Sequence, residues 1–339
     1  MAIWVVAAAT IISITIAWFA IESRRRRTHP VSGGLHTEIT LPHTQEFELY
    51  GNPFSHCSRK TRIVFAELGI DYLHHDIDLI ETGSYQTISP AYLKINPAGL
   101  VPCLVHRGHP IFESDEILAY AATHAGPAAQ RLVPEAEQAR WDMMRWVDYA
   151  SLSSDDPMGG RVARAGSCIP GLTMPLFMTM IAHVPLPRIF VGLLFHPDKK
   201  RPAFFGAARI FGLRRMLRLT PLRRTIRDSR DHMRTHLAAL EAQLRKTGGP
   251  WLLGADYTLA DVSWSCLLLR LAETAWLDYF LARQDLAEIA AYWRRLQARP
   301  SWQAAITART HPNIERGAAD LQQMIENDPW MREALQGED

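Results

Sequence analysis

The stretch LYGNPFSHCSRKTRI, residues 49–63, decides the fold of this chain. Its first residues continue a short apolar run that predicts a strand, and the Gly-Asn-Pro sequence after Tyr50 predicts a turn. From Ser58 to Leu68 the apolar residues recur at helical spacing, and Gly69 supplies a helix stop. Strand, turn and helix therefore follow one another without a long connection.

The segment after this helix keeps alternating between strand and helix patterns. The expected elements are a strand at 72–77, a short helix at 89–93, strands at 102–105 and 110–112, and a helix from 114 to 122 that Ser114 caps. A hairpin turn around Gly108 joins the last two strands. The predicted order is β-α-β-α-β-β-α.

Strand patterns stop after Gly126, and the remainder of the chain predicts helices. The expected helices lie at 135–149, 231–244, 258–277 and 287–298. Thr258 and Asp261 have the spacing of a capping box, which we interpret as a folding element. The fold class is therefore α/β followed by all-α.

Composition excludes several classes of protein. Hydrophobic residues make up 47% and charged residues 21% of the chain, which is typical of globular proteins. Thirty-seven basic against 35 acidic residues give a net charge of +2, so we expect no nucleic-acid partner. The four cysteines are too few and too widely spaced for a disulfide scaffold or a zinc site, and the histidines lack metal-site spacing, so we expect no metal.

The N-terminus predicts a membrane anchor. Ala2–Ile21 carries no charge and, as a helix, would span ~30 Å, the thickness of a hydrocarbon core. A cleaved signal peptide would need positive charge before the apolar run and small residues after it. Here Arg24–Arg27 follow the run, and bulky Trp18 and Phe19 occupy the place of a cleavage site. We therefore expect an uncleaved single-pass anchor with the rest of the chain in the cytoplasm.

The next residues, 28–45, are polar with two glycines and two prolines, which predicts a flexible tether. The resulting division is a transmembrane helix, a linker, an α/β domain, an all-α domain with an insertion, and a tail, at 2–21, 22–45, 46–126, 127–312 (insertion 151–227) and 313–339.

The insertion has an unusual composition. Ala165–Pro187 holds 23 residues with no formal charge but four prolines, and Lys199–Arg227 holds ten basic residues and no acidic one. An apolar lid followed by a solvated basic face is one interpretation. On a chain already tethered to a membrane, contact of residues 165–227 with an anionic lipid surface is the other.

Three segments resemble the glutathione S-transferase superfamily. They are residues 49–63, the stretch NPAGLVPCL at 96–104, and FESDEILAY at 112–120. The resemblance implies a thioredoxin-like N-terminal domain followed by an all-helical domain. The Ser-x-Cys-Ser sequence is most similar to the zeta class and to relatives that reductively dehalogenate chlorinated hydroquinones.

The resemblance also implies two candidate catalytic residues. Ser55 precedes a helix, where its hydroxyl can donate to a glutathione thiolate at the positive end of the helix dipole. A plain N-cap serine is the alternative. Cys57 lies two residues further on and, in the relatives, forms a mixed disulfide with glutathione; a buried apolar role is its alternative.

Four further residues are implied in glutathione binding. The Val101-Pro102 bond should be cis, exposing the Val101 backbone to the cysteinyl backbone of glutathione. Ser114 and the first amides of its helix suit the γ-glutamyl carboxylate, and Glu113 can meet the ammonium group. A strand-leading proline and an ordinary helix start are the alternatives for these two pairs.

Together these features predict a membrane-tethered transferase that activates the thiol of glutathione for attack on a hydrophobic electrophile, with thiol transfer or dehalogenation as related activities. A non-catalytic or weakly catalytic membrane-binding adaptor on the same scaffold is the alternative. Formation of a homodimer stays open.

Overall fold

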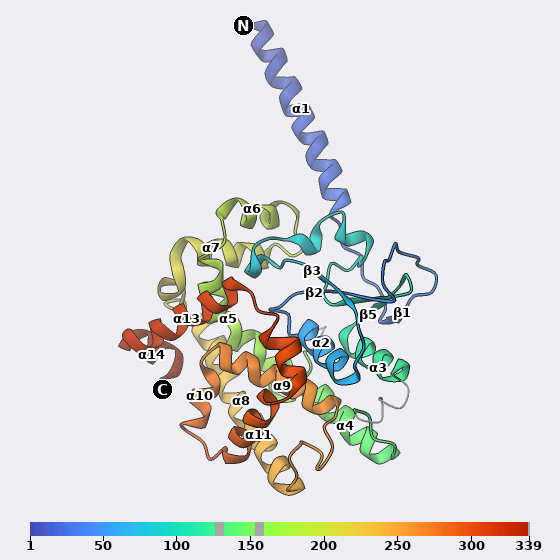
Figure 1. Ribbon diagram of the computed structural model, residues 1–339. Coiled ribbons are helices and arrows are strands. Elements are labelled where there is room, and N and C mark those ends of the chain that lie inside the picture. The colour runs from blue at the N-terminus through green and yellow to red at the C-terminus, as the bar shows by residue number, and fades with distance from the viewer. Residues whose placement is uncertain (126–131, 153–158, 338–339) are drawn as a thin grey trace.

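The computed structural model describes residues 1–125, 132–152 and 159–337. Figure 1 shows a rounded body from which one long helix, α1 (Ala2–Arg25), projects. The domain boundary expected after Gly126 lies outside the described residues, as do residues 153–158 of the insertion.

The first half of the body is built on a five-stranded sheet with the order β1-β5-β4-β2-β3. Strand β2 pairs in parallel with β3, and the other pairings are antiparallel. The strands are β1 (Gly34–Leu35), β2 (Phe47–Gly51), β3 (Leu73–Asp76), β4 (Cys103–His106) and β5 (His109–Phe112). Helices α2 (His56–Leu68) and α3 (Ser114–His124) pack together beside this sheet. The predicted thioredoxin-like domain is confirmed.

Local details follow the sequence closely in this half. Gly69 ends α2 in the left-handed conformation, and the β4–β5 turn has positive φ at Arg107 and Gly108. The short helix expected at 89–93 is a 3₁₀ turn, η3 (Tyr92–Lys94), which follows η1 (Ile80–Thr82) and η2 (Gln86–Ile88). Ser114 does not cap α3: it is the first helical residue, and no described side chain caps this end.

Residues 28–45 do not form the flexible tether that the sequence predicts. Gly34 and Leu35 form the edge strand β1, paired with β5. Val31, Ile39 and Leu41 pack on the face of the sheet opposite α2 and α3. These apolar side chains are too widely spaced among polar residues to give a strand pattern, yet together they cover a sheet face that would otherwise be wet.

The second half is helical, as predicted. Its helices are α4 (Glu137–Ala150), α5 (Ile169–Ile181), α6 (Leu186–Phe195), α7 (Lys200–Met216), α8 (Thr220–Thr247), α9 (Leu259–Glu273), α10 (Trp276–Leu281), α11 (Ala287–Gln297), α12 (Pro300–Trp302), α13 (Pro312–Asn327) and α14 (Pro329–Gln336). Short 3₁₀ turns, η5 (Gly159–Val162) and η6 (Gly166–Cys168), precede α5, and a π-turn, η7 (Gln303–Thr307), follows α12. The Thr258–Asp261 capping box is present at the start of α9.

The apolar part of the insertion is core. Helix α5 packs against α7, α8, α9 and α13, and Leu172, Leu176 and Met180 are fully buried. The prediction that residues 165–227 contact a membrane is therefore wrong for α5, because its apolar residues already have protein partners. Residues 313–339, expected as a tail, form α13 and α14, and α13 packs on α5.

The single helix expected at 258–277 is two helices. Ala275 has φ 60°, in the left-handed region, and separates α9 from α10. The hydroxyl of Thr274 donates to the carbonyl of Arg270 at 2.7 Å and so satisfies an end of α9. The break turns Trp276 inward, where its indole N–H donates to the carbonyl of Leu172 in α5. Burial of the tryptophan therefore outweighs continuation of the helix.

Glu48 joins the tether to the sheet. Its carboxylate accepts hydrogen bonds from the backbone N–H groups of Thr44 at 2.5 Å and Gln45 at 3.1 Å. The Nε2 atom of His75 lies 2.8 Å from its other oxygen. Burial would raise the pKa of Glu48, but these hydrogen bonds prevail and lower it from 4.5 to about 2.

We therefore expect Glu48→Gln to lower the free energy of unfolding by about 1–3 kcal/mol at neutral pH. Because the folded pKa lies below the unfolded one, the carboxylate contributes fully above pH 4.5, and its contribution falls as the pH drops toward 2. Thermal unfolding in detergent should show the gap between wild type and variant narrowing over that interval. A gap independent of pH would contradict this role.

Candidate functional site

The three sequence motifs meet at one end of the sheet. Tyr50 of β2 pairs with Cys103 of β4, and Leu104 of β4 pairs with Ile111 of β5. Because both pairings are antiparallel, the carboxyl ends of β2 and β5 lie beside the amino end of β4. The turn after β2, the loop before β4 and the start of α3 therefore reach the same edge, which is where a shared binding site can form.

Ser55 is held between a helix end and the loop before β4. It is the N-cap of α2, and its Oγ accepts a hydrogen bond from the N–H of Ser58 at 3.2 Å. The same hydroxyl points its proton toward the carbonyl of Val101 at 3.5 Å. The Val101-Pro102 bond is cis, as predicted. The cap and the approach to Val101 coexist, so the N-cap alternative does not remove the hydroxyl from the site.

Three buried arginines bind the carbonyl groups of the turn that carries Ser55. Arg59 Nε donates to the carbonyl of Pro53 at 2.7 Å, and Arg62 donates to that of Asn52 at 3.2 Å. Arg270, from α9, donates to the carbonyl of Phe54. We call this set of contacts the arginine clamp. It satisfies three consecutive carbonyls that the tight turn leaves without sheet partners.

Glu273 of α9 neutralises the arginine clamp. Its two carboxylate oxygens lie 2.5 and 2.9 Å from the two terminal nitrogens of Arg59, a bidentate pair. Burial would raise the pKa of Glu273, but Arg59 and Arg270 hold it below its usual range. The Arg270 guanidinium also lies 3.6 Å from the centroid of the Phe54 ring. These contacts join the two halves of the protein directly behind Ser55.

A cavity of about 430 Å³ opens beside Ser55 and Val101, which both line it. Cys57, Pro102, Glu113 and Ser114 do not occur among the described residues that form its wall. The remaining wall comes from several elements and includes Thr28 after α1, His56 of α2, Tyr85 between η1 and η2, Phe177 of α5, His196 after α6, Arg201 of α7 and Arg270 of α9.

Much of that wall was not predicted from the sequence. An ion pair of 2.6 Å joins Arg201 to the fully buried Glu81 and fastens α7 of the insertion to η1. Tyr85 packs against α6, where Gly192 leaves room for its ring. These residues carry no motif, because their meeting depends on the path of the insertion. The insertion therefore supplies one side of the cavity.

His56 was passed over between two chosen residues. Its side chain is buried and lines the cavity, and its Nε2 atom finds no hydrogen-bond partner among the described residues. Burial holds the pKa of His56 well below its usual value, and nearby Lys60 and Arg270 lower it further. The imidazole is therefore neutral near pH 7. Its place inside the motif was the one signal available.

Cys57 is the accessible cysteine of the four. It is half-buried near the start of α2, whereas Cys103, Cys168 and Cys266 are buried. Burial raises the pKa of Cys168 to about 12 and that of Cys266 to about 11, which keeps these two thiols protonated. The alternative that Cys57 is a fully buried apolar residue is wrong.

Glu113 and Ser114 lie where β5 leads into α3. Glu113 is exposed and has φ 65°, an uncommon conformation for a residue other than glycine. Ser114 is nearly buried at the first position of α3. The strained backbone turns the Glu113 side chain out at a helix N-terminus, and such outliers often mark binding sites. Within the described ranges, no three His, Cys, Asp or Glu side chains are grouped to hold a metal.

Two family models match the chain. Residues 54–124 match the glutathione S-transferase N-terminal domain, and residues 223–304 match the glutathione S-transferase C-terminal domain. The first match begins beside Ser55 and ends with α3, and the second contains the α9 residues of the arginine clamp. The chain therefore belongs to the glutathione S-transferase superfamily. Helix α1 and residues 125–222 lie outside both matches.

Curated relatives agree over most of the chain. It is 24% identical over 286 residues to the tetrachloro-p-hydroquinone reductive dehalogenase of Sphingobium chlorophenolicum, covering 80% of this chain and 99% of the relative. It is 24% identical to the glutathione S-transferase TCHQD of Arabidopsis thaliana, covering 76% and 89%. The relatives thus include both transferases and reductive dehalogenases.

Solved structures show the same fold. The β-etherase LigF from Sphingobium sp. strain SYK-6 matches with a TM-score of 0.62 at 19% identity, covering 78% of this chain and all of that one. A glutathione transferase of Phanerochaete chrysosporium, solved in complex with oxidized glutathione, matches at 0.53 and 19% identity, covering 79% and 97%. At these identities the likeness concerns the fold alone.

The arginine clamp predicts an unequal response to two neutralised carboxylates. Glu273→Gln should lower the free energy of unfolding by about 3–5 kcal/mol, because it leaves the buried guanidinium of Arg59 without its counter-ion. Asp285→Asn should change it by less than about 1 kcal/mol, because the Arg245–Asp285 pair is exposed. Denaturant unfolding of both variants measures the difference. Equal losses would show that the clamp is not the stabilising contact inferred here.

Proposed function

We propose that this protein is a membrane-tethered glutathione transferase that activates the thiol of glutathione for attack on a hydrophobic electrophile. The observation that carries the proposal is the position of Ser55. Its hydroxyl lies at the N-terminus of α2, next to the Val101 carbonyl and on the wall of a cavity large enough for a small organic molecule.

Glutathione is the proposed co-substrate, bound across the edge where the three motifs meet. The Val101 backbone would pair with the cysteinyl part of glutathione in the manner of an added strand. Ser114 and the first amides of α3 would bind the γ-glutamyl carboxylate at the positive end of the helix dipole. The exposed carboxylate of Glu113 would meet the ammonium group. These roles place the thiol near Ser55.

Ser55 would stabilise the thiolate. Its contact with the Val101 carbonyl is long, so the hydroxyl can redirect its proton toward a sulfur anion at small cost. The thiol proton leaves to solvent, and the thiolate sulfur then forms a bond to the electrophilic carbon. The leaving group departs with the electron pair of the broken bond. The hydrogen bond and the α2 dipole favour the thiolate and so lower the pKa of the bound thiol.

The cavity supports a hydrophobic electrophile. Phe54, Ile88 and Phe177 contribute apolar surface to its wall, and Arg201 and His196 add polar groups at the side of the insertion. A flat apolar molecule with a polar substituent fits such a wall. The dehalogenases among the relatives make a halogenated aromatic compound a reasonable member of this class.

Helix α1 supports the tether. Its 24 residues include none that the protein buries, and it is the one helix of the described ranges that is long and apolar enough to cross a membrane. Arg24, Arg25 and Arg27 are exposed at its C-terminal end. By the positive-inside rule, the body of the protein would face the cytoplasm.

Calorimetry of the detergent-solubilised full chain tests the binding of glutathione. Wild type should bind it, and Ser114→Ala should weaken binding by about 1–3 kcal/mol through loss of a charge-assisted hydrogen bond. Ser84→Ala, a serine that hydrogen-bonds Asp78 away from the proposed carboxylate site, serves as the control. No heat from wild type at millimolar glutathione would leave the non-catalytic adaptor as the better function.

Two further variants separate the candidate catalytic residues. If Ser55 stabilises the thiolate, Ser55→Ala should lower turnover about 10²-fold or more and leave glutathione affinity nearly unchanged. If Cys57 forms a mixed disulfide, Cys57→Ser should abolish activity, and wild type should carry a glutathione adduct visible by intact mass. We expect the Ser55 result. Full activity of Ser55→Ala would transfer the role to Cys57.

A further inference from the structure

Helix α6 lies at the foot of α1. Figure 1 shows α6 at the end of the body from which α1 projects. The ring of Phe195, the last residue of α6, has centroid distances of 6.1 Å to Trp18 and 5.5 Å to Phe19. The guanidinium of Arg26 lies 5.2 Å from the centroid of the same ring. The two helices therefore meet where α1 leaves its apolar stretch.

One face of α6 is fixed to the body. Ile189 is buried, and the backbone at Gly192 approaches the ring of Tyr85 so closely that a Cβ would overlap it. Arg188 donates from Nη1 to the carbonyl of Gly83 at 2.9 Å. These contacts leave α6 no freedom to turn its other face inward.

The opposite face of α6 is apolar and open. Leu186, Phe190 and Leu194 follow one another at intervals of four residues, and their exposed fractions are 45%, 59% and 42%. Pro187 and Leu193 lie beside this row, and none of the five carries charge. An exposed row of this kind is unusual on a soluble surface and is typical of a contact site. We call it the α6 apolar face.

Basic side chains stand at both sides of the α6 apolar face. Arg24, Arg25 and Arg27 are exposed at the end of α1, and Lys199 and Lys200 are exposed just after α6. An apolar row flanked by basic residues matches the chemistry of a bilayer surface, with acyl chains inside and anionic headgroups around them. Continuity with α1, which must enter the same bilayer if it anchors the chain, selects lipid rather than a protein as the occupant.

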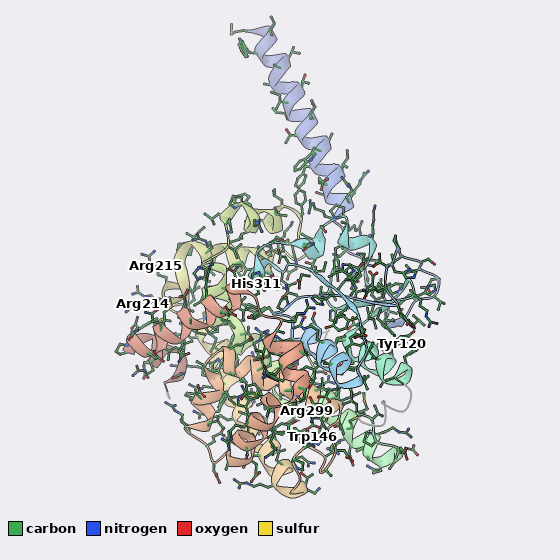
Figure 2. All side chains as sticks on the ribbon, in the orientation of Figure 1. Tyr120, Trp146, Arg214, Arg215, Arg299 and His311 are labelled. Carbon is green, nitrogen blue, oxygen red and sulfur yellow. The ribbon has the colours of Figure 1, made fainter. Side chains whose placement is uncertain are left out.

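This surface is narrower than the sequence predicts. Arg214 of the basic stretch forms an ion pair of 2.9 Å with Asp328 and lies over the ring of Trp330. Figure 2 places Arg214 and Arg215 at a side of the body away from the foot of α1. Arg209 donates to the carbonyl of Val184. Most of the stretch 199–227 therefore serves the body, and α6 with its two flanking lysines remains.

The cavity beside Ser55 lies next to this surface. Its wall includes Thr28, three residues after the end of α1, and His196 and Pro197, which directly follow α6. The N–H of His29 donates to the carbonyl of Pro97 at 2.8 Å and so holds the segment after α1 against the loop before β4. A molecule dissolved in the membrane would thus reach the cavity between the two helix ends.

We propose that α6 lies in the interface of the bilayer that α1 crosses, and that the cavity takes a lipophilic electrophile directly from the lipid. The inference rests on the proposed anchoring by α1. It assigns the insertion a purpose, because α6 closes one side of the cavity and at the same time sets its position at the membrane. The class of second substrate is an apolar molecule that partitions into lipid.

Fluorescence quenching tests the position of α6. The full chain with Phe190→Cys is labelled with a thiol-reactive fluorophore and reconstituted in phosphatidylcholine–phosphatidylserine vesicles whose acyl chains carry bromine. Trp141→Cys is the control, because Trp141 is exposed on α4, at the far end of the body from α1. Labelled wild type corrects for the half-exposed Cys57.

We expect brominated lipid to quench the label at position 190 and not the label at position 141. If the protein floats with the vesicles but position 190 is not quenched, α1 anchors the chain and the inference about α6 is wrong. If the protein does not float, the anchoring fails and the inference fails with it. Neither readout involves glutathione, so the catalytic proposal stands or falls separately.

Kinetics test delivery from the membrane. In vesicles, the double variant Phe190→Ser with Leu194→Ser should raise the KM for an alkyl-chain aryl chloride several-fold and leave that for a sulfonated, water-soluble aryl chloride unchanged. Trp141→Ser should change neither. An equal rise for both substrates would mean that the variant damages the cavity wall, and an unchanged KM for both would overturn uptake from lipid.

Discussion

The arginine clamp is the contact on which the site depends. A chain that leaves β2 and turns at once into α2 exposes the carbonyls of residues 52–54, and these have no sheet partner. Arg59 and Arg62 reach back from α2, and Arg270 reaches across from α9, so the turn is held from both halves of the protein. Glu273 supplies the counter-charge. The position of Ser55 therefore follows from charges buried between the two domains.

The sequence predicts the α/β half well, because its signals are local. The strand-turn-helix of residues 49–63, the left-handed Gly69 and the cis bond before Pro102 are each determined within a few residues. The sequence could not predict that Arg59 and Arg62 are buried, because charged residues near a helix start are usually exposed. Their partners, Glu273 and the carbonyl of Ala305, lie far along the chain.

The site was predictable in part for the same reason. Ser55 and Val101 belong to motifs, and the structure brings them together on one cavity wall. Tyr85 and Arg201 belong to none, because their place there depends on how α6 and α7 pack over η1 and η2. The insertion was recognisable by its composition, but composition alone does not separate the buried α5 from the exposed α6. Both are apolar, and only their partners differ.

The central claim is that the turn at Ser55 lowers the pKa of a bound thiol, and ultraviolet titration of the enzyme–glutathione complex tests it most directly. Thiolate absorbance measured against pH gives the pKa of the bound thiol, which the account predicts to lie at least about one unit below that of free glutathione. In Ser55→Ala, the bound thiol should titrate close to the free value. A wild-type complex whose thiol titrates as in free solution would contradict the account.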